Sequence, residues 1–345
     1  MRSFALGVKI RGKFKNKLTP EMYTKMAMQK SVPDVARILK EETGYGNVLA
    51  DIDTENIHRG YLEKLLAGSI MSDISSLRHF AGIDGSSFMQ IFTVSEEIEN
   101  IKVFLRLLYS GRPEQFRPSP VLSGKGEIDF SKFSSINSFG ELLNEISGTE
   151  YAIPLKGFLE YPEHQNIFDM EIALDMYYNS LVFKKAKKNL DKQEYEVIRE
   201  IYGSEMDLET VMLIIRAKRS FDFSKEQLYS YTRFRHAHLC DEVVEQMVAA
   251  STEKEVFEVL KATKYRDVFK GDNRFPEKKI DEYLAKLHKK GYRKAEYSVE
   301  AVLCYVKLKE VELRNVVTII EGIRYGLSAA DIEKYLIGFD RQEGR

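Results

Sequence analysis

The 345-residue chain is long enough for two or three compact domains. Its 52 basic residues nearly balance 53 acidic ones, whereas a dedicated nucleic-acid binder would carry a basic excess. Two cysteines are too few for a disulfide framework, and no apolar run approaches the roughly 18 residues that cross a membrane. With no secretion signal at the N-terminus, the sequence predicts a soluble, cytoplasmic protein that meets a membrane peripherally or through a partner.

Short capped helices recur along the chain. The segment 31–45 opens with serine at the cap position and proline in the first turn, and it ends at a tyrosine. The same apolar spacing returns at 138–151 and at 252–265, again ending at a tyrosine. We therefore predict the same short helix in three places, roughly a hundred residues apart.

Longer helical segments carry an acid and a small polar residue in line with an apolar stripe. On a helix, residues three or four apart share one face, so these polar side chains point where the apolar ones point. The aligned positions are separated by about 110 and then 105 residues. The acid and polar residue of each copy are Glu97 with Asn100, Asp207 with Thr210, and Glu312 with Asn315.

A third recurring pattern and the segments rich in proline, glycine and serine also fit a repeat. The pattern at 174–181 matches that at 280–287 and is weaker at 59–65. Proline, glycine and serine concentrate at 111–126, which marks a boundary, and a less marked boundary lies near 220–224. Strand-like alternation is scarce. We predict an all-α protein of three similar helical-bundle subdomains, with the ranges 1–115, 116–222 and 223–345.

Catalytic and cofactor motifs are missing from the sequence. It has no Gly-x-x-x-x-Gly-Lys phosphate loop and no dinucleotide fingerprint. His236, His238 and Cys240 are spaced two apart, so on a helix they face different directions and do not converge on a metal. One Glu-x-x-His pair, Glu55 with His58, is half of what a di-iron bundle needs. The sequence predicts no catalytic residue, no cofactor, no metal and no small-molecule substrate.

The recurring polar pairs have two interpretations. Clustered carboxylates could act as general acids or bases, but an active site rarely needs three equivalent copies. Buried polar groups that hydrogen-bond a neighbouring segment account better for a threefold recurrence. We interpret all six residues as structural polar groups of the repeat cores.

A basic segment is the remaining candidate. This basic segment is either a helix face exposed to solvent or a patch that faces anionic lipid headgroups or an acidic partner. A second lysine-rich stretch lies at 183–189. The candidate patch consists of Lys278, Lys279, Lys286, Lys289, Lys290, Arg293 and Lys294.

The C-terminal signature resembles a known family. The pattern runs from Tyr305 through Lys309 and Glu312 to Asn315. It is similar to the closing motif of the central-stalk C subunits of V-type and archaeal-type ATPases and ATP synthases, whose counterparts in eukaryotic vacuolar enzymes are the d subunits. The segments 8–18, 31–45 and 173–177 resemble that family in the same order. The resemblance covers the whole chain.

This resemblance implies a funnel of three subdomains around a pseudo-threefold axis. It implies a non-catalytic rotor component that lies between the rotating shaft and the membrane proteolipid ring and transmits torque for proton or sodium transport. The expected partners are the shaft subunits and the ring, with the protein peripheral to the membrane as part of the complex. Two alternatives stay open, a helical scaffold or adaptor unrelated to ATPases and, more distantly, a metal- or carboxylate-dependent hydrolase.

Overall fold

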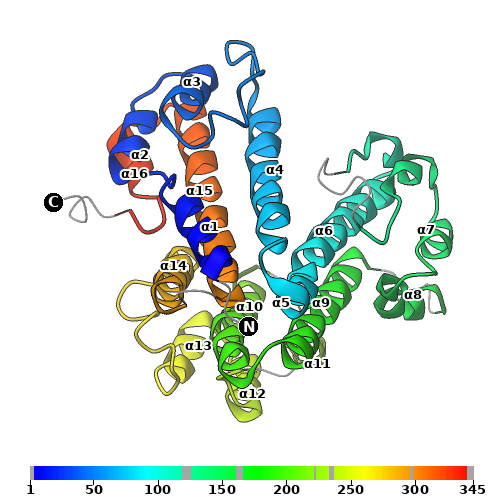
Figure 1. The fold of residues 1–345 in the computed structure, drawn as a ribbon. Coiled ribbons are helices and arrows are strands. Elements are labelled where there is room, and N and C mark those ends of the chain that lie inside the picture. Colours follow the sequence, from blue (N-terminus) through cyan, green and yellow to red (C-terminus); the bar gives the residue numbers. More distant parts are fainter. Residues whose placement is uncertain are drawn as a thin grey trace. The chain divides into compact units, whose positions relative to one another are not determined.

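The structure is a computed structural model that describes residues 4–118, 126–160, 166–220, 223–232, 237–295 and 298–339. Every regular element in these ranges is a helix, which confirms the prediction of an all-α protein (Figure 1). None of the described helices is both long and apolar enough to span a bilayer. His236, considered above as a metal ligand, lies outside the described ranges.

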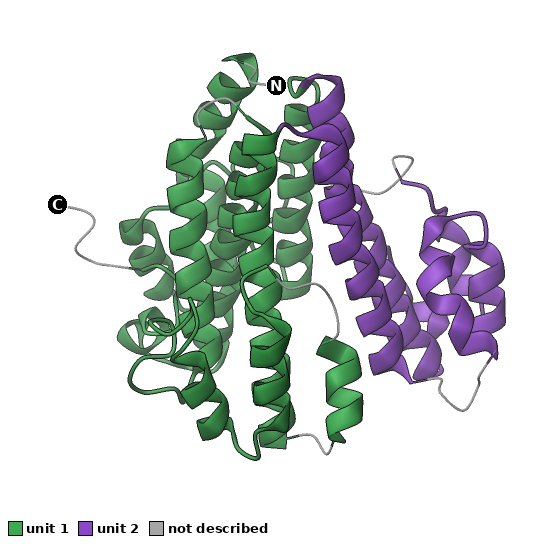
Figure 2. Ribbon diagram, turned by 90° about the horizontal axis from the view of Figure 1, so that it is seen from below, with its two compact units in different colours: residues 1–81, 192–345 green, residues 82–191 purple. Residues whose placement is uncertain are grey.

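Contacts divide the chain into two compact units (Figure 2). Unit 2 is the continuous segment 82–191, whereas unit 1 combines 1–81 with 192–345. Unit 1 is therefore built from both ends of the chain.

In unit 2, described residues form a hydrophobic core between two long helices, α6 and α9, which pack against each other. Phenylalanines fill this core, and Phe104 packs edge-on against Phe116 and Phe133 with ring centroids 5.3 and 4.9 Å apart. The elements of unit 2 are α5 (Gly82–Phe88), α6 (Gln90–Tyr109), η1 (Pro113–Gln115), η3 (Phe130–Ser135), α7 (Phe139–Glu145), η4 (Glu150–Leu155), α8 (Lys156–Glu160) and α9 (Ile167–Asn189).

Unit 1 has more helices, and its longest carry most of the packing: α10 contacts α14, α14 contacts α15, and α15 contacts α4. Its elements are α1 (Phe4–Phe14), α2 (Pro20–Ala27), α3 (Val32–Glu42), α4 (Arg59–Arg78), α10 (Lys192–Ser220), α11 (Lys225–Thr232), α12 (Asp241–Ala249), α13 (Glu253–Leu260), α14 (Pro276–Lys294), α15 (Val299–Arg324) and α16 (Ala329–Glu333).

Two of the hydrophobic cores formed by the described residues lie inside unit 1. One joins α10 to the segment that follows it, up to the start of α14. The other joins α15, through Val316, Ile319 and Ile320, to the N-terminal helices α2, α3 and α4. Figure 1 shows the orange α15 among the blue N-terminal helices. The last long helix thus completes its core with the first residues of the chain.

The three short helices are specified by local sequence. Ser31, Ser138 and Thr252 are extended at the N-cap, and each side chain accepts a hydrogen bond from the backbone N–H three residues later. These caps confirm the predicted helix starts. Each short helix, namely α3, α7 and α13, leads within a few residues into a buried tyrosine.

The cores are offset against the predicted subdomain ranges. Each core combines a long helix with a segment that contains a capped short helix. The long helices are α6, α10 and α15. The predicted boundaries at 115/116 and 222/223 fall just after such long helices. The division into three subdomains stays a prediction, and its physical basis is that each of these three cores contains one long helix and one capped short helix.

Candidate functional site

Three carboxylates lie in the interior at the repeated positions. Glu97 on α6, Asp207 on α10 and Glu312 on α15 are 1, 0 and 4% exposed. Each accepts a hydrogen bond from the tyrosine that follows a capped short helix. The pairs are Tyr151 with Glu97 at 2.5 Å, Tyr265 with Asp207 at 2.7 Å, and Tyr45 with Glu312 at 2.7 Å.

Backbone N–H groups fill the remaining acceptor sites of these carboxylates. An ionised carboxylate accepts several hydrogen bonds, so one side chain can hold a whole loop. Glu97 accepts from the N–H groups of residues 127 and 128 at 2.7 and 3.0 Å, and Asp207 accepts from those of 237 and 238 at 3.0 and 2.8 Å. Glu312 accepts from the N–H of Leu18 at 2.7 Å. Each carboxylate therefore ties a long helix to a distant stretch of backbone.

The glycine at 126 allows one of these approaches. A Cβ atom at Gly126 would lie 2.2 Å from Glu97 Oε1, which is closer than any real contact. A side chain at this position would displace the Glu97 carboxylate from the place where it accepts the N–H groups of residues 127 and 128.

The three tyrosine hydroxyls stay protonated, and so remain hydrogen-bond donors, because their surroundings raise their pKa. Burial, together with the adjacent carboxylate, raises the pKa of Tyr45, Tyr151 and Tyr265 well above its ordinary value of 10. A neutral hydroxyl that donates to an anion is a stable pair in the interior, with no proton available near neutral pH. The sequence pattern placed these tyrosines in the repeat but did not reveal that they are the partners of the acids.

The small polar residues of the three copies have different partners. Asn100 Nδ2 donates to the carbonyl of Glu96 at 2.8 Å, and Thr210 Oγ1 donates to the carbonyl of Met206 at 3.0 Å. Both carbonyls belong to the residue's own helix. Asn315 instead bonds both peptide groups of Ile337, donating to its carbonyl at 3.0 Å and accepting from its N–H at 2.8 Å.

Replacing Asn315 by leucine is expected to lower the free energy of unfolding by roughly 1–3 kcal/mol, because two buried peptide groups of Ile337 lose their partner. Urea denaturation measures the change. Thr318→Val, one turn further on, is the control: Thr318 Oγ1 donates to the carbonyl of Arg314 on its own helix, and its loss should stay within about 0.5 kcal/mol. If both substitutions lower the free energy of unfolding equally, the hydrogen bonds between Asn315 and Ile337 do not contribute specifically to stability.

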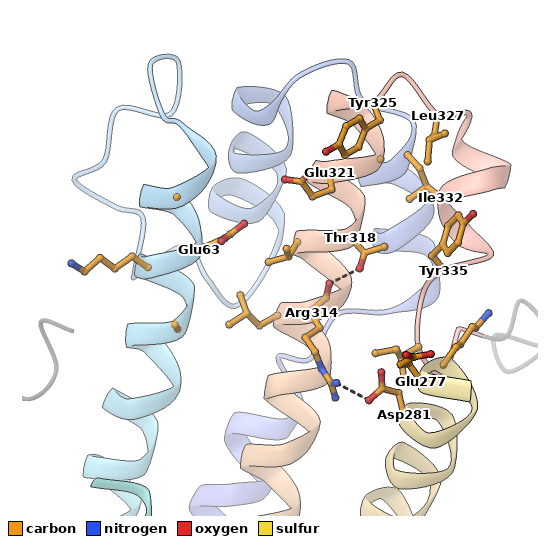
Figure 3. Close-up of a pocket in the computed structure, with 18 residues that line it drawn as sticks. Glu63, Glu277, Asp281, Arg314, Thr318, Glu321, Tyr325, Leu327, Ile332 and Tyr335 are labelled. Carbon is orange, nitrogen blue, oxygen red and sulfur yellow. Dashed lines mark hydrogen bonds and ion pairs between the residues drawn. The ribbon is translucent and has the colours of Figure 1, made fainter. Parts of the chain in front are cut away.

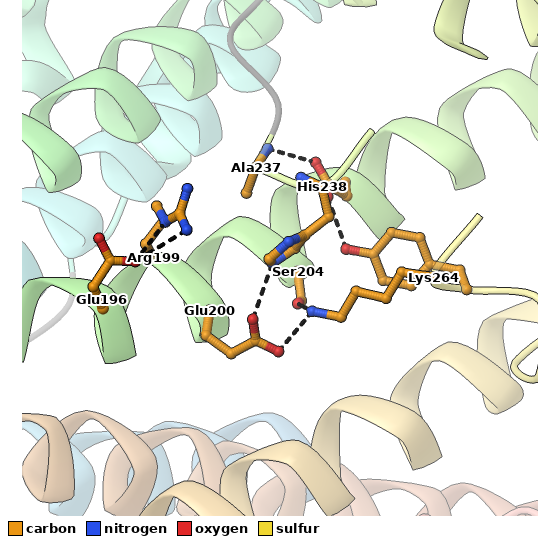
Figure 4. A network of polar contacts seen from close by, with 9 residues as sticks. Glu196, Arg199, Glu200, Ser204, Ala237, His238 and Lys264 are labelled. Atoms are coloured by element: carbon orange, nitrogen blue, oxygen red, sulfur yellow. Dashed lines mark hydrogen bonds and ion pairs between the residues drawn. The ribbon is translucent and has the colours of Figure 1, made fainter. Parts of the chain in front are cut away.

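His238, one residue of the possible metal pattern, instead takes part in a network of polar contacts (Figure 4). His238 Nε2 lies 3.2 Å from Glu200 Oε2, and Lys264 Nζ lies 2.6 Å from Glu200 Oε1. Burial and the nearby Lys264 lower the pKa of His238. Among the described residues no cluster of three or more histidine, cysteine or acidic side chains could hold a metal.

A groove of about 900 Å³ in unit 1 is lined by α4, α14, α15 and the segment around α16 (Figure 3). Two of its charged groups pair with each other, Arg314 with Asp281 at 2.7 Å. Around it lie exposed apolar side chains, including Tyr325 and Tyr335 at 78 and 55% exposure. Such a lining is suited to contact with another polypeptide rather than to acid–base chemistry.

The sequence model of the ATP synthase (C/AC39) subunit family matches residues 6–335. The chain belongs to this family. It is 25% identical to the C subunit of the A-type ATP synthase of Methanocaldococcus jannaschii, over 87% of this chain and 77% of that protein. It is 20% identical to the protein of the same name from Methanosphaera stadtmanae, over 95% of this chain and 86% of the relative. The resemblance predicted from the sequence is thereby confirmed.

The residues of the C-terminal signature that suggested the C/AC39 family all lie on α15, and their contacts are structural. Tyr305 donates to Asp73 on α4, and Lys309 donates to Tyr45 at 2.7 Å and to Glu312. Asn315 holds Ile337, as described above. The motif therefore joins the C-terminal long helix to the N-terminal segment.

The predicted basic patch separates into two groups on α14. Lys278 donates to the carbonyl of Lys334, and Lys279 donates to the carbonyl of Lys270 and to Asn273 Oδ1, both at 2.8 Å. Both ammonium groups are therefore hydrogen-bonded within unit 1. The other five, which line a separate concavity, are Lys286, Lys289, Lys290, Arg293 and Lys294.

Proposed function

We propose that this member of the C/AC39 family is a non-catalytic component of the central stalk of an A- or V-type ATPase or ATP synthase. It couples the rotating shaft to the membrane proteolipid ring and transmits torque for proton or sodium transport. Its three subdomains surround a pseudo-threefold axis, and the protein sits on the cytoplasmic side, peripheral to the membrane. The observation that carries the proposal is the family match along nearly the whole chain.

The buried polar groups support a mechanical role. A body that transmits torque needs helices that do not slide past one another, and close-packed interiors resist deformation. Each buried carboxylate adds directional bonds between a long helix and a remote segment, as Glu312 does with Tyr45 and Leu18. In a catalytic site such carboxylates would face a substrate, whereas here their acceptor sites are filled by the chain itself.

Deleting the gene for this protein from its host is expected to uncouple the enzyme. ATP hydrolysis by the catalytic head should survive, because the head does not depend on this chain for chemistry, while ATP-driven ion uptake into membrane vesicles should be lost. Expression of the intact chain in the deletion strain should restore uptake. Ion uptake that stays fully coupled without the chain would rule out the central-stalk role.

A helical adaptor is the second candidate, and the groove with exposed Tyr325 and Tyr335 favours it, since such a groove could receive any apolar segment. Affinity purification from detergent-solubilised membranes separates the two functions. A stalk protein is recovered with the proteolipid ring and the shaft in fixed proportion, whereas a general adaptor brings down other proteins without them.

A further inference from the structure

Cations crowd the second half of α14. Lys286, Lys289, Lys290, Arg293 and Lys294 line a concavity of about 620 Å³, together with Phe339 from the segment after α16. Glu282 is the one acidic residue that lines it in the described part of the chain. Among these cations Lys286, Lys290, Arg293 and Lys294 are exposed.

Three of the five cations lack an ionic partner in the part of the chain that the structure describes. Within the described ranges, no carboxylate lies within ion-pair distance of Lys286, Arg293 or Lys294. Elsewhere on α14, Asp281 pairs with Arg314, and Glu282 lies 3.6 Å from Lys278. The unpaired cations are therefore a local feature of the concavity and not a general property of this helix.

The spacing of these cations is unfavourable for the helix alone. Like charges three or four residues apart repel each other, and this segment contains several such pairs, for example Lys286 with Lys290 and Lys290 with Lys294. The negative end of the helix dipole stabilises Arg293 and Lys294 in the last turn. It does not reach Lys286, two turns earlier. An external anion would relieve the repulsion at all of these positions together.

The shape of the site indicates the class of anion. A bilayer is broad and flat, and peripheral helices that bind it insert apolar side chains beside their basic residues. None of the large, exposed apolar side chains in the described part of the chain lines this concavity. A hollow walled by cations, with the half-buried Phe339 at one side, is complementary instead to a polypeptide carrying carboxylates and some apolar surface.

We propose that the concavity on α14 binds an acidic polypeptide segment of another protein, whose carboxylates pair with Lys286, Arg293 and Lys294. The inference deepens the proposed function and rests on it for one point, that the partner belongs to the same complex. The binding of an acidic segment rests on the concavity alone.

The test uses the purified full chain and a fluorescein-labelled polyglutamate peptide, with binding followed by fluorescence anisotropy. Binding should weaken with added salt, because it depends on exposed charges. The triple variant Lys286→Glu/Arg293→Glu/Lys294→Glu should bind about tenfold more weakly or worse and lose the salt dependence. Unchanged far-UV circular dichroism shows that the variant is folded, and the triple glutamine variant provides a milder substitution at the same positions.

A matched control lies on α9 of unit 2. Lys184, Lys187 and Lys188 are exposed, and changing them to glutamate alters the net charge by the same amount. This variant should retain most of the affinity. If both variants lose the same affinity for the peptide, the effect is due to net charge and the proposal is wrong. The proposal is also wrong if the folded wild-type chain does not bind the peptide.

Vesicles containing phosphatidylglycerol test the lipid alternative. If the α14 variant loses sedimentation with these vesicles but keeps its affinity for the peptide, the concavity is a lipid site and the proposal is wrong. That outcome would not affect the central-stalk role, because the role is tested separately by deleting the gene and measuring ion uptake. Conversely, coupled ion uptake without the chain would reject the stalk role, while peptide binding could still be measured on the purified protein.

Discussion

Replacing Glu312 by alanine is expected to lower the free energy of unfolding by roughly 3–5 kcal/mol, the range for breaking a buried ion pair from one side. The substitution leaves the Tyr45 hydroxyl, the Leu18 N–H and the Lys309 ammonium group without their shared acceptor. Lys309 is 12% exposed, so water compensates little for the lost carboxylate. Urea denaturation measures the loss, and faster hydrogen exchange at the Leu18 amide would locate it.

Glu310→Ala is the control for this prediction. Glu310 is on the same helix but 46% exposed, and it lies 3.5 Å from Lys307 at the surface, so its removal should cost less than about 1 kcal/mol. Tyr45→Phe should fall between the two, at roughly 1–3 kcal/mol, because it removes one hydroxyl and leaves the other bonds of Glu312 in place. A Glu312→Ala variant as stable as Glu310→Ala would show that the carboxylate does not hold the N-terminal segment.

The helical class could be predicted because it depends on local sequence. Apolar spacing and capping residues specify helix starts without reference to the rest of the chain, as at Ser31 and Thr252. The positions of the three acids also followed from spacing, since an acid on an apolar stripe must point inward. Burial of such a side chain requires hydrogen-bond partners, so their existence could be expected but not their identity.

The partners could not be predicted, because they depend on which copies of the repeat pack together. The bond from Tyr45 to Glu312 joins residues 267 positions apart, and that from Leu18 joins residues 294 apart. Periodicity is the same whether a long helix packs on the segment before it or after it. The long helices α6 and α10 pack on the segment that follows them, whereas α15 packs on the N-terminal segment.

Spacing alone also gave too coarse a description of the basic segment. Charge along the sequence grouped Lys278 and Lys279 with the later cations of α14. The structure separates them, because the carbonyls of Lys334 and Lys270 lie within reach of the first two. The remaining cations face a hollow formed partly by Phe339, a residue far away in sequence. A patch is defined by what surrounds it, which the linear pattern does not contain.

A buried charge cluster in unit 1 makes stability depend on pH. Glu205 on α10 is 8% exposed and lies 3.1 Å from His288 Nε2 on α14 and 3.2 Å from Lys307 Nζ on α15. Burial alone would raise the pKa of this carboxyl, but Lys307 and His288 outweigh it and lower the pKa from 4.5 to about 2. The ionised carboxylate thus joins three long helices.

The sign of the effect follows from this shift. Because the folded pKa of Glu205 lies below its unfolded value, the carboxylate stabilises the protein above about pH 4.5, and this contribution is lost as the pH falls toward 2. A shift of this size corresponds to about 3 kcal/mol near neutral pH. Glu205→Gln should be less stable than wild type by about that amount at pH 7, and the difference should shrink by about half at pH 3.

Urea denaturation of both proteins across this pH range measures the difference directly. Comparing the variant with wild type at each pH isolates the contribution of Glu205, because the two chains differ at that side chain alone. Since the glutamine also leaves Lys307 without its buried anion, Lys307→Met in the Glu205→Gln background should recover part of the stability at pH 7. A stability difference that stays constant between pH 7 and pH 3 would mean that Glu205 is not held ionised by its neighbours, and the three helices would then be joined by packing alone.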